Sequence, residues 1–357
     1  MIFFDIIIFK NFKTDYKVIK ISFFLFLLVL AISLLNYVPD YPGGWSFLRQ
    51  FFLLSVGFFS LCRMLSASKL TEVEIENVFI KSVFLLSVLN LLGIGAGSID
   101  GRVTLFGMNP NLIGIFAVIA ILFLLKRSYF ENDKTKLNRK KHNILFFISI
   151  LFMLFSTGSR GGVISLFLII TAFFYFREKK IVNKIKYLVL SLLASFSLYL
   201  LVINNALLNR RFFGNEEDSD AGRSVLWEKV LSIVDTNPIF GVGIFKYQQQ
   251  IELLNNNRII NTHNEFLSFL VYTGFVGLFF FLYFLFKLFM RSIKKYKVDN
   301  EPLLIIILII LIFNLFKAGG LLLSPLVWAL FSYILVYSKF DDEISLRMSL
   351  NRRYLKK

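Results

Sequence analysis

Residues 144–176 read ILFFISILFMLFSTGSRGGVISLFLIITAFFYF, an apolar stretch with a single polar turn near its middle. As one helix these 33 residues would be roughly 50 Å long, whereas the hydrocarbon core of a bilayer is about 30 Å thick. Both flanks are basic, and because Lys and Arg mark the cytoplasmic side, an even number of crossings must separate them. We therefore predict two short helices, 144–156 and 162–176, joined by an outward turn below the outer surface of the membrane.

The rest of the chain has a similar composition. Of its 357 residues, 57% are hydrophobic and 18% are charged, whereas soluble domains contain roughly 45–50% apolar and about 25% charged residues. These values exclude a soluble globular protein and predict an all-α, polytopic membrane helix bundle. The ten expected transmembrane helices are about 21–38, 46–62, 78–95, 111–126, 144–156, 162–176, 187–203, 265–286, 302–316 and 321–338.

The net charge of +17 is distributed asymmetrically around these helices. With a cytoplasmic N-terminus, 28 of the 40 Lys and Arg residues lie in inside segments and 10 lie outside. This asymmetry predicts that both termini are cytoplasmic, and it explains the charge without nucleic acid. The lone cysteine, Cys62, excludes an internal disulfide framework, and with two histidines the chain offers few ligands for a metal. We expect neither a metal nor a cofactor.

Four segments follow from this topology. We predict an N-terminal transmembrane bundle over residues 1–203, an outer loop over 204–264, C-terminal transmembrane helices over 265–338 and a basic cytoplasmic tail over 339–357. The outer loop, of about 60 residues, is periplasmic or extracellular and contains one helical apolar stripe. The stripe consists of Leu226, Val230, Ile233 and Val234. We expect this helix, with Trp227 near the stripe, to lie on the membrane surface or to cap the helix bundle, and to end before Asn-Pro.

Charged residues on the outer side require an explanation, because an Arg near mid-bilayer costs about 2.5–3.5 kcal/mol. Four clusters contain them: Gly101-Arg102 with Asn109-Pro110-Asn111; Ser159-Arg160-Gly161-Gly162; Asp218-Ser219-Asp220-Ala221-Gly222-Arg223 ahead of Trp227 and Asn237-Pro238; and Thr262-His263-Asn264-Glu265. Guanidinium groups form bidentate bonds to phosphate oxygens, so the three arginines are suited to hold a diphosphate. His263 is suited to accept a proton near neutrality.

Each of these residues also has a structural interpretation. Arg160 is also compatible with an interfacial position in a tight turn between helices. Arg102 and Arg223 are also suited to salt bridges with the acidic residues of the outer loop, and His263 to capping the helix that begins near Asn264. The acidic run over 216–220 lacks the ligand spacing of a calcium loop and is typical of a solvated turn.

The order of these motifs resembles that of the O-antigen ligase and O-antigen polymerase superfamily. The resemblance covers roughly residues 95–285. It rests on Ser-Arg-Gly-Gly between two apolar helices, Gly-Arg-x-x-x-Trp and Asn-Pro-x-x-Gly-x-Gly in the outer loop, and Thr-His-Asn-Glu-Phe-Leu at the start of a helix. The family pattern carries over to Arg160, Arg223 and His263, and less securely to Arg102.

The resemblance also suggests which neighbouring residues support the site. An acidic position of the family's outer loop aligns with Asp218 or Asp220, and the two alternatives stay open because these residues lie close together. The supporting residues are Ser159, Gly161, Asn264 and Glu265. Gly161 would let the backbone approach a phosphate, next to the positive end of the following helix.

The resemblance implies a metal-independent glycosyltransferase in the bacterial cytoplasmic membrane, surrounded by membrane lipid. Its donor would be an oligosaccharide on undecaprenyl diphosphate at the outer leaflet. Ligases of the family transfer the glycan to the lipid A core of lipopolysaccharide, and polymerases transfer it to another lipid-linked glycan. The modest outer loop offers little to recognise a second kind of acceptor, which favours a polymerase.

In such a reaction the arginines would stabilise charge on the departing diphosphate while His263 removes a proton from the acceptor hydroxyl. Attack opposite the diphosphate predicts inversion at the anomeric carbon. A transporter of the same lipid-linked sugars would also use basic residues, but these would line a path through the membrane, often in repeated halves. The basic clusters lie on one side, and no repeat is evident. A scaffold without chemistry is the third alternative.

Overall fold

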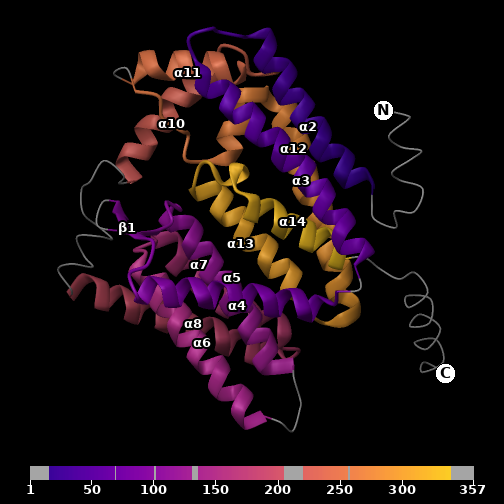
Figure 1. Ribbon diagram of the computed structural model, residues 1–357, viewed down its shortest axis with the longest axis vertical. Helices are drawn as coiled ribbons and strands as arrows, with labels where there is room; N and C mark the ends of the chain where they lie inside the picture. Colours follow the sequence, from indigo (N-terminus) through magenta and orange to yellow (C-terminus); the bar gives the residue numbers. More distant parts are fainter. Residues whose placement is uncertain are drawn as a thin grey trace. The chain divides into compact units, whose positions relative to one another are not determined.

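The computed structural model describes residues 16–68, 70–99, 102–130, 136–204, 220–255 and 258–338 (Figure 1). These residues form twelve α-helices, one short 3₁₀ helix and one β-hairpin. The elements are α2 (Tyr16–Leu35), α3 (Pro42–Ala67), α4 (Glu72–Leu91), β1 (Ala96–Ile99), β2 (Arg102–Leu105), α5 (Pro110–Phe130), α6 (Lys136–Ser156), α7 (Arg160–Arg177), α8 (Ile181–Asn204), α10 (Asp220–Val234), α11 (Gly243–Leu254), α12 (Glu265–Asp299), α13 (Leu303–Lys317), η1 (Leu321–Leu323) and α14 (Pro325–Tyr337).

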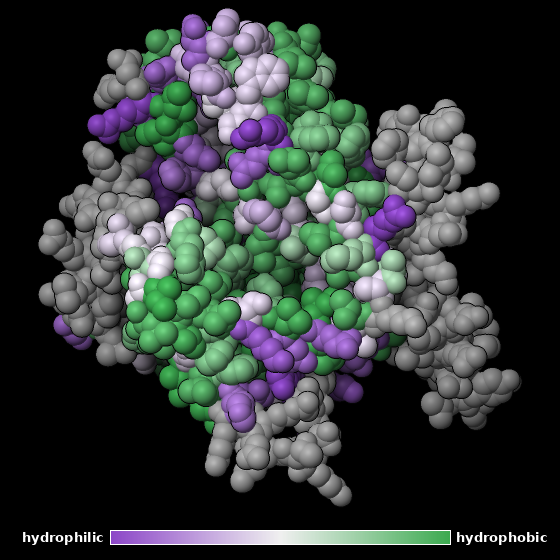
Figure 2. Space-filling view, viewed as in Figure 1, coloured by the Kyte–Doolittle hydropathy of each residue, from purple (hydrophilic) through white to green (hydrophobic). Residues whose placement is uncertain are grey.

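Each of the ten predicted membrane segments overlaps one of these helices, so the all-α membrane class is confirmed. Five helices, α2, α3, α5, α7 and α12, are long and apolar enough to cross a membrane, and α13, α14 and the part of α6 from His142 are shorter apolar helices. Large apolar side chains remain exposed, including Leu35 at 85% and Leu253 at 74%. Figure 2 shows apolar residues over broad areas of the visible face, as expected for a surface in contact with lipid.

The chain divides into two compact units that are not contiguous in sequence. The first unit comprises residues 1–69, 223–311 and 318–357, and the second comprises 70–222 and 312–317. Helices that are distant in the chain therefore share a unit, as α2 and α12 do in the first. These units reflect tertiary contacts, whereas the four segments predicted from the sequence reflect hydropathy and charge.

In the first unit, α2 packs on α12 and α3 packs on α14. Trp328 of α14 lies at the centre of an aromatic cluster, where its indole contacts Phe51 and Phe58 of α3 with ring centroids 5.9 and 5.5 Å apart. Phe284 of α12 and Phe331 of α14 complete the cluster in an edge-to-face pair at 5.3 Å. Such pairs each contribute about 0.5–1.5 kcal/mol beyond area burial. This core fixes α12, the helix into which the His263 loop leads.

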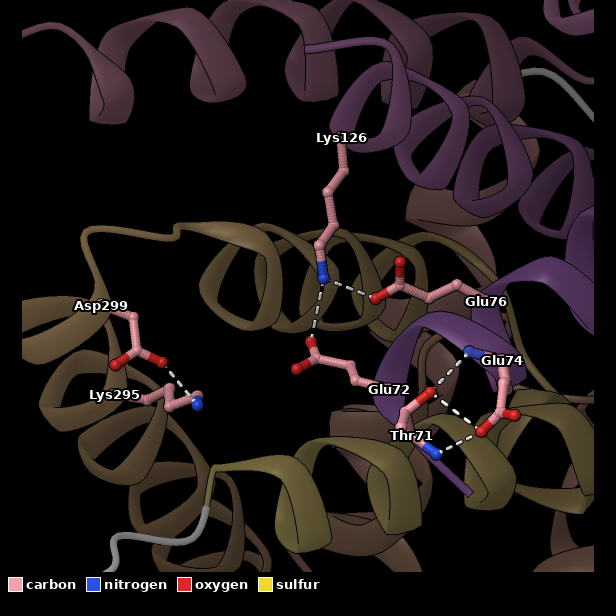
Figure 3. A network of polar contacts seen from close by, with 7 residues as sticks. All are labelled: Thr71, Glu72, Glu74, Glu76, Lys126, Lys295 and Asp299. Carbon is pink, nitrogen blue, oxygen red and sulfur yellow. Dashed lines mark hydrogen bonds and ion pairs between the residues drawn. The ribbon is translucent and has the colours of Figure 1, made fainter. Parts of the chain in front are cut away.

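In the second unit, α5 is the central helix and contacts α4, α6 and α7. Its side chains from Ala117 to Leu124 are buried. Near one end of α5, the ammonium of Lys126 lies 2.7 Å from Glu76 and 3.2 Å from Glu72 of α4 (Figure 3). Lys126 and Glu76 are both buried, so the ion pair neutralises two charges that would be costly alone.

The structure differs from the sequence-based expectation in three elements. The β-hairpin before α5 and the helix α11 were not predicted, and α12 extends to Asp299, beyond the expected end near residue 286. A straight helix of 35 residues would be about 52 Å long, but α12 is interrupted at Gly274, whose backbone is not helical (φ 62°, ψ −164°). The interruption lies in the segment that follows His263.

Candidate functional site

The loop that carries His263 is fixed by hydrogen bonds on both sides of the histidine. Asn264 caps α12, because its Oδ1 accepts hydrogen bonds from the amides of Phe266 (3.0 Å) and Leu267 (3.2 Å). Thr262 Oγ1 donates to the carbonyl of Asn264 at 2.8 Å. The capping role considered for His263 therefore belongs to Asn264.

The backbone of His263 adopts an uncommon conformation. Its φ is +53°, in the left-handed region that non-glycine residues rarely adopt. The amide of His263 donates to Asn261 Oδ1 at 3.3 Å, which helps to hold this conformation. Residues in such regions cost about 1–3 kcal/mol and persist where the surrounding structure enforces them. The strain is consistent with a residue whose placement serves function.

The connection between α13 and α14 packs directly against the His263 loop. The buried carboxylate of Glu265 accepts a hydrogen bond from the Leu322 amide at 3.2 Å, and the amides of Gly320 and Leu321 also bond to it. A Cβ at Gly319 would lie 2.3 Å from Asn261 Oδ1 and 2.8 Å from the His263 nitrogen, so only glycine fits there. Glu265 is therefore an anchor between the His263 loop and this connection.

Helix α10 brings Arg223 to the same region of the first unit. The predicted apolar stripe is buried, with exposures of 7% or less for Leu226, Val230, Ile233 and Val234. The indole of Trp227 donates to the carbonyl of Thr262 at 2.9 Å, directly before His263. Arg223 is partly buried and lies one helical turn before Trp227, on the same side of α10. The Arg-x-x-x-Trp and Thr-His-Asn motifs therefore meet through Trp227.

The Asn-Pro-x-x-Gly-x-Gly turn has a structural explanation. The Phe275 amide donates to the carbonyl of Pro238 at 2.9 Å, at the point where α12 is interrupted. A Cβ at Gly274 would lie 2.2 Å from the Ile239 oxygen, and a Cβ at Gly241 would lie 2.6 Å from the Gly274 nitrogen. Both glycines have positive φ and allow the turn to enter the kink of α12.

Helix α11 braces the other side of the His263 loop. The hydroxyl of Tyr247 donates to the carbonyl of Ile260 at 2.8 Å. Burial of Tyr247 raises the pKa of its hydroxyl well above the ordinary value, so it stays a donor at physiological pH. The hydroxyl of Tyr41 donates to Glu252 at 2.7 Å near the end of α11, and this hydrogen bond raises the pKa of Tyr41.

In the second unit, the Ser-Arg-Gly-Gly turn opens α7. Ser159 caps the helix by accepting a hydrogen bond from the Gly162 amide at 3.0 Å, and its hydroxyl donates to Asn111 Oδ1 at 3.1 Å. Arg160 is the first residue of α7 and is partly buried. The structure therefore joins the Asn-Pro-Asn motif to the Ser-Arg turn, and it begins α7 two residues earlier than predicted.

The two glycines after Arg160 have different roles. A Cβ at Gly162 would lie 3.3 Å from the Cα of Gly114, so this glycine permits close packing of α7 on α5. A Cβ at Gly161 would instead lie 3.7 Å from Lys317 Nζ and 3.6 Å from Asn314 Oδ1, both in the last turns of α13. The sequence interpretation did not include Asn314 and Lys317 in the site. Their polarity within an apolar helix was the available signal.

The remaining predicted site residues are only partly described. Arg102 lies in β2 and Asp220 begins α10, but their side chains are outside the described part of the chain, and Asp218 lies outside the described residues. Arg223 and His263 belong to the first unit, and Arg102 and Arg160 belong to the second. No group of three His, Cys, Asp or Glu side chains within the described ranges has the arrangement of a metal site.

Comparison with protein families confirms the resemblance. Residues 144–282 match the model of the family described as O-antigen ligase. The matched region begins with α6 and ends within α12, and it includes Arg160, Arg223 and His263. No curated protein sequence shows a significant match to the chain.

Among solved structures, the fold is similar to that of a chain in a structure described as "Structural coordination of polymerization and crosslinking by a peptidoglycan synthase complex". The TM-score is 0.50 at 16% sequence identity, and the alignment covers 91% of this chain and 96% of the other. At this identity the similarity concerns the fold alone. It extends beyond the family-matched region to nearly the whole chain.

Proposed function

We propose that this chain is an inverting membrane glycosyltransferase that transfers a glycan from undecaprenyl diphosphate to a sugar hydroxyl, and that it polymerises polysaccharide repeat units. The match to the O-antigen ligase family over residues 144–282 carries the proposal, because it spans Arg160, Arg223 and His263 together. The hydrogen bond between Trp227 and Thr262 supports it, because it joins the helix of Arg223 to the loop of His263.

The proposed reaction takes place on the side of the membrane away from the cytoplasm. The excess of Lys and Arg in alternate loops predicts cytoplasmic termini in a bacterial inner membrane. In that topology Arg102, Arg160, Arg223 and His263 all belong to outward-facing segments. Donor sugars on undecaprenyl diphosphate would then reach the site from the outer leaflet.

The arginines are proposed to act on the leaving group. As the bond between the anomeric carbon and the diphosphate oxygen breaks, its electron pair stays with undecaprenyl diphosphate. Arg160, at the start of α7, and Arg223, on α10, would stabilise this charge by bidentate hydrogen bonds in a partly dehydrated environment. In this proposal guanidinium groups have the role that a divalent metal has in many soluble glycosyltransferases.

His263 is proposed as the general base. The acceptor hydroxyl oxygen attacks the anomeric carbon from the face opposite the diphosphate while the imidazole takes its proton, so the product has the inverted configuration. The proton then passes from His263 to solvent. Asn264, Glu265 and Trp227 would keep the imidazole in place through the contacts of the loop.

A ligase that transfers the glycan to lipid A core is the second candidate, because the matched family is described as O-antigen ligase. The segment from residue 204 to residue 264 favours the polymerase, since it is modest in size for recognising a different acceptor. Both candidates use the same donor chemistry.

The test is to incubate purified protein with repeat units on undecaprenyl diphosphate, with and without lipid A core. His263→Ala protein in the same mixtures gives the background. A ladder of longer lipid-linked glycans supports the polymerase. Transfer only to the core identifies a ligase. If protein that is correctly folded in detergent consumes no donor in either mixture, glycosyl transfer is contradicted.

A further inference from the structure

Helix α13 is apolar except at its end. Its sequence is LLIIILIILIFNLFK, in which Asn314 and Lys317 are the only polar residues. Lys317 is the last residue of this helix, and a lysine at the end of a membrane helix can extend its ammonium toward the polar interface. What the ammonium lies beside therefore indicates what it could bind.

The side chain of Lys317 reaches the first turn of α7. A Cβ at Gly161 would lie 3.5 Å from Lys317 Cδ and 3.7 Å from its Nζ. Both residues belong to the second unit, and Gly161 directly follows Arg160. Because Gly161 has no side chain, the ammonium of Lys317 can lie beside the backbone of the turn that carries Arg160.

The contact is fixed by neighbouring hydrogen bonds. Asn314, one turn before Lys317, donates through Nδ2 to Ser165 Oγ of α7 at 3.1 Å, and both residues are buried. On the other side, Ser159 caps α7 and is held by Asn111. Uncharged side chains therefore fix the last turn of α13 against the first two turns of α7.

We propose that Lys317 is a further phosphate-binding residue, which holds the lipid diphosphate together with Arg160. The inference rests on the proposed function for the identity of the ligand. An arginine forms bidentate contacts to one phosphate, whereas the compact ammonium of a lysine binds phosphate as a point charge. An arginine on this turn and a lysine beside it match the two negatively charged groups of a diphosphate better than the single group of a monophosphate.

The test is a binding measurement on purified protein in detergent with undecaprenyl diphosphate and undecaprenyl monophosphate as probes. Lys317→Gln removes the charge at nearly constant length, and Lys317→Arg retains it. Lys287→Gln is the matched control, because Lys287 is also a helix lysine and its ammonium lies over the Tyr283 ring at 5.1 Å. Size-exclusion profiles and thermal unfolding verify that each variant is folded.

We expect Lys317→Gln to weaken binding of undecaprenyl diphosphate about tenfold or more and binding of the monophosphate less, as for the loss of a charge-assisted hydrogen bond. Lys317→Arg should stay within about threefold of the wild type, and Lys287→Gln should be unchanged. In turnover assays the Gln variant should raise KM for the donor without changing the pH profile, since His263 is intact.

Three results would overturn the inference. Unchanged diphosphate affinity in Lys317→Gln, with lower thermal stability, would mean that Lys317 only stabilises the C-terminus of α13. Equal loss for both probes would mean that the lysine does not distinguish a diphosphate. If phosphatidylglycerol displaces bound undecaprenyl diphosphate as effectively as unlabelled undecaprenyl diphosphate does, the ligand of Lys317 is a membrane headgroup.

The outcomes separate this inference from the proposed function. Loss of binding in Arg160→Gln but not in Lys317→Gln contradicts the role of Lys317 and leaves glycosyl transfer in place. Loss in both variants, in a protein that transfers no glycan to any acceptor, supports Lys317 as a diphosphate ligand and contradicts the glycosyltransferase.

Discussion

His263 combines a strained backbone with the side chain best suited to proton transfer. Its left-handed φ of +53° is maintained by the Asn264 cap, by the bond from its own amide to Asn261 and by the close fit of Gly319. These contacts hold the imidazole of His263 at one place in the loop, which is what the proposed proton transfer requires.

Replacing His263 tests this argument. We expect both His263→Ala and His263→Gly to lower glycan transfer by about 10²–10⁴-fold, the usual contribution of a general base. The Gly variant should be at least as thermally stable as the Ala variant, because glycine adopts positive φ without strain. The control is His142→Ala, which changes the other histidine, an exposed residue of α6. Wild-type polymer lengths in His263→Ala would contradict the assignment.

Glu265 illustrates how a residue near the chemistry can act through structure. Its carboxylate accepts hydrogen bonds from the backbone amides of residues 320–322. In Glu265→Gln, the side-chain NH₂ group would face these backbone N–H groups, and two donors cannot form a hydrogen bond. We expect a loss of about 1–3 kcal/mol in stability, seen as a lower thermal midpoint, and a reduced kcat at unchanged donor KM. A large increase in donor KM with unchanged stability would instead indicate contact with substrate.

The interruption of α12 shows how one glycine places a helix against a distant turn. We expect Gly274→Ala to destabilise the fold by more than 2 kcal/mol, or to prevent folding, because a Cβ would lie 2.2 Å from the Ile239 oxygen and φ is +62°. Gly57→Ala is the control: Gly57 lies within α3 with no atom within 4 Å of an added Cβ, so alanine should stabilise by roughly 0.5–1 kcal/mol. Thermal unfolding in detergent measures both.

The ion pair between α4 and α5 is a further structural element that the sequence did not indicate. Replacing Lys126 with Met leaves the carboxylate of Glu76 buried without its partner, 2.7 Å away in the wild type, and should destabilise the protein by about 3–5 kcal/mol (Figure 3). In Lys126→Met/Glu76→Leu, which removes both charges of this pair, most of the loss should be recovered. If the double variant is no more stable than the single variant, the pair does not account for the stability.

Helix positions were predictable, whereas contacts between helices were not. Long apolar runs specify transmembrane helices because backbone groups in lipid must be satisfied within the helix, and all ten runs overlap helices. The strands of the hairpin, Ala96–Ile99 and Arg102–Leu105, are too short to show an alternating apolar pattern in the sequence. Proximity of Lys317 to Gly161, or of Trp227 to Thr262, depends on tertiary packing that spacing along the chain does not encode.

The same distinction applies to the predicted site. Residue chemistry names Arg102, Arg160, Arg223 and His263 as candidates, because charged groups in an apolar chain are costly, and their roles stay predictions. From the sequence, capping of this helix is the structural alternative for His263, whereas the geometry assigns the cap to Asn264. The supporting roles of Asn261, Gly319 and Tyr247 required the folded chain.

The membrane orientation of the whole chain can be measured with introduced cysteines, because the one native cysteine, Cys62, is fully buried. We expect a membrane-impermeant maleimide added to intact cells, or to spheroplasts if an outer membrane is present, to label Glu228→Cys on α10, since charge asymmetry places this exposed residue outside. Lys179→Cys, between α7 and α8, should react only after the membrane is opened. The reverse pattern would direct Arg223 and His263 to the cytoplasm, where a lipid-linked donor of the outer leaflet does not reach them.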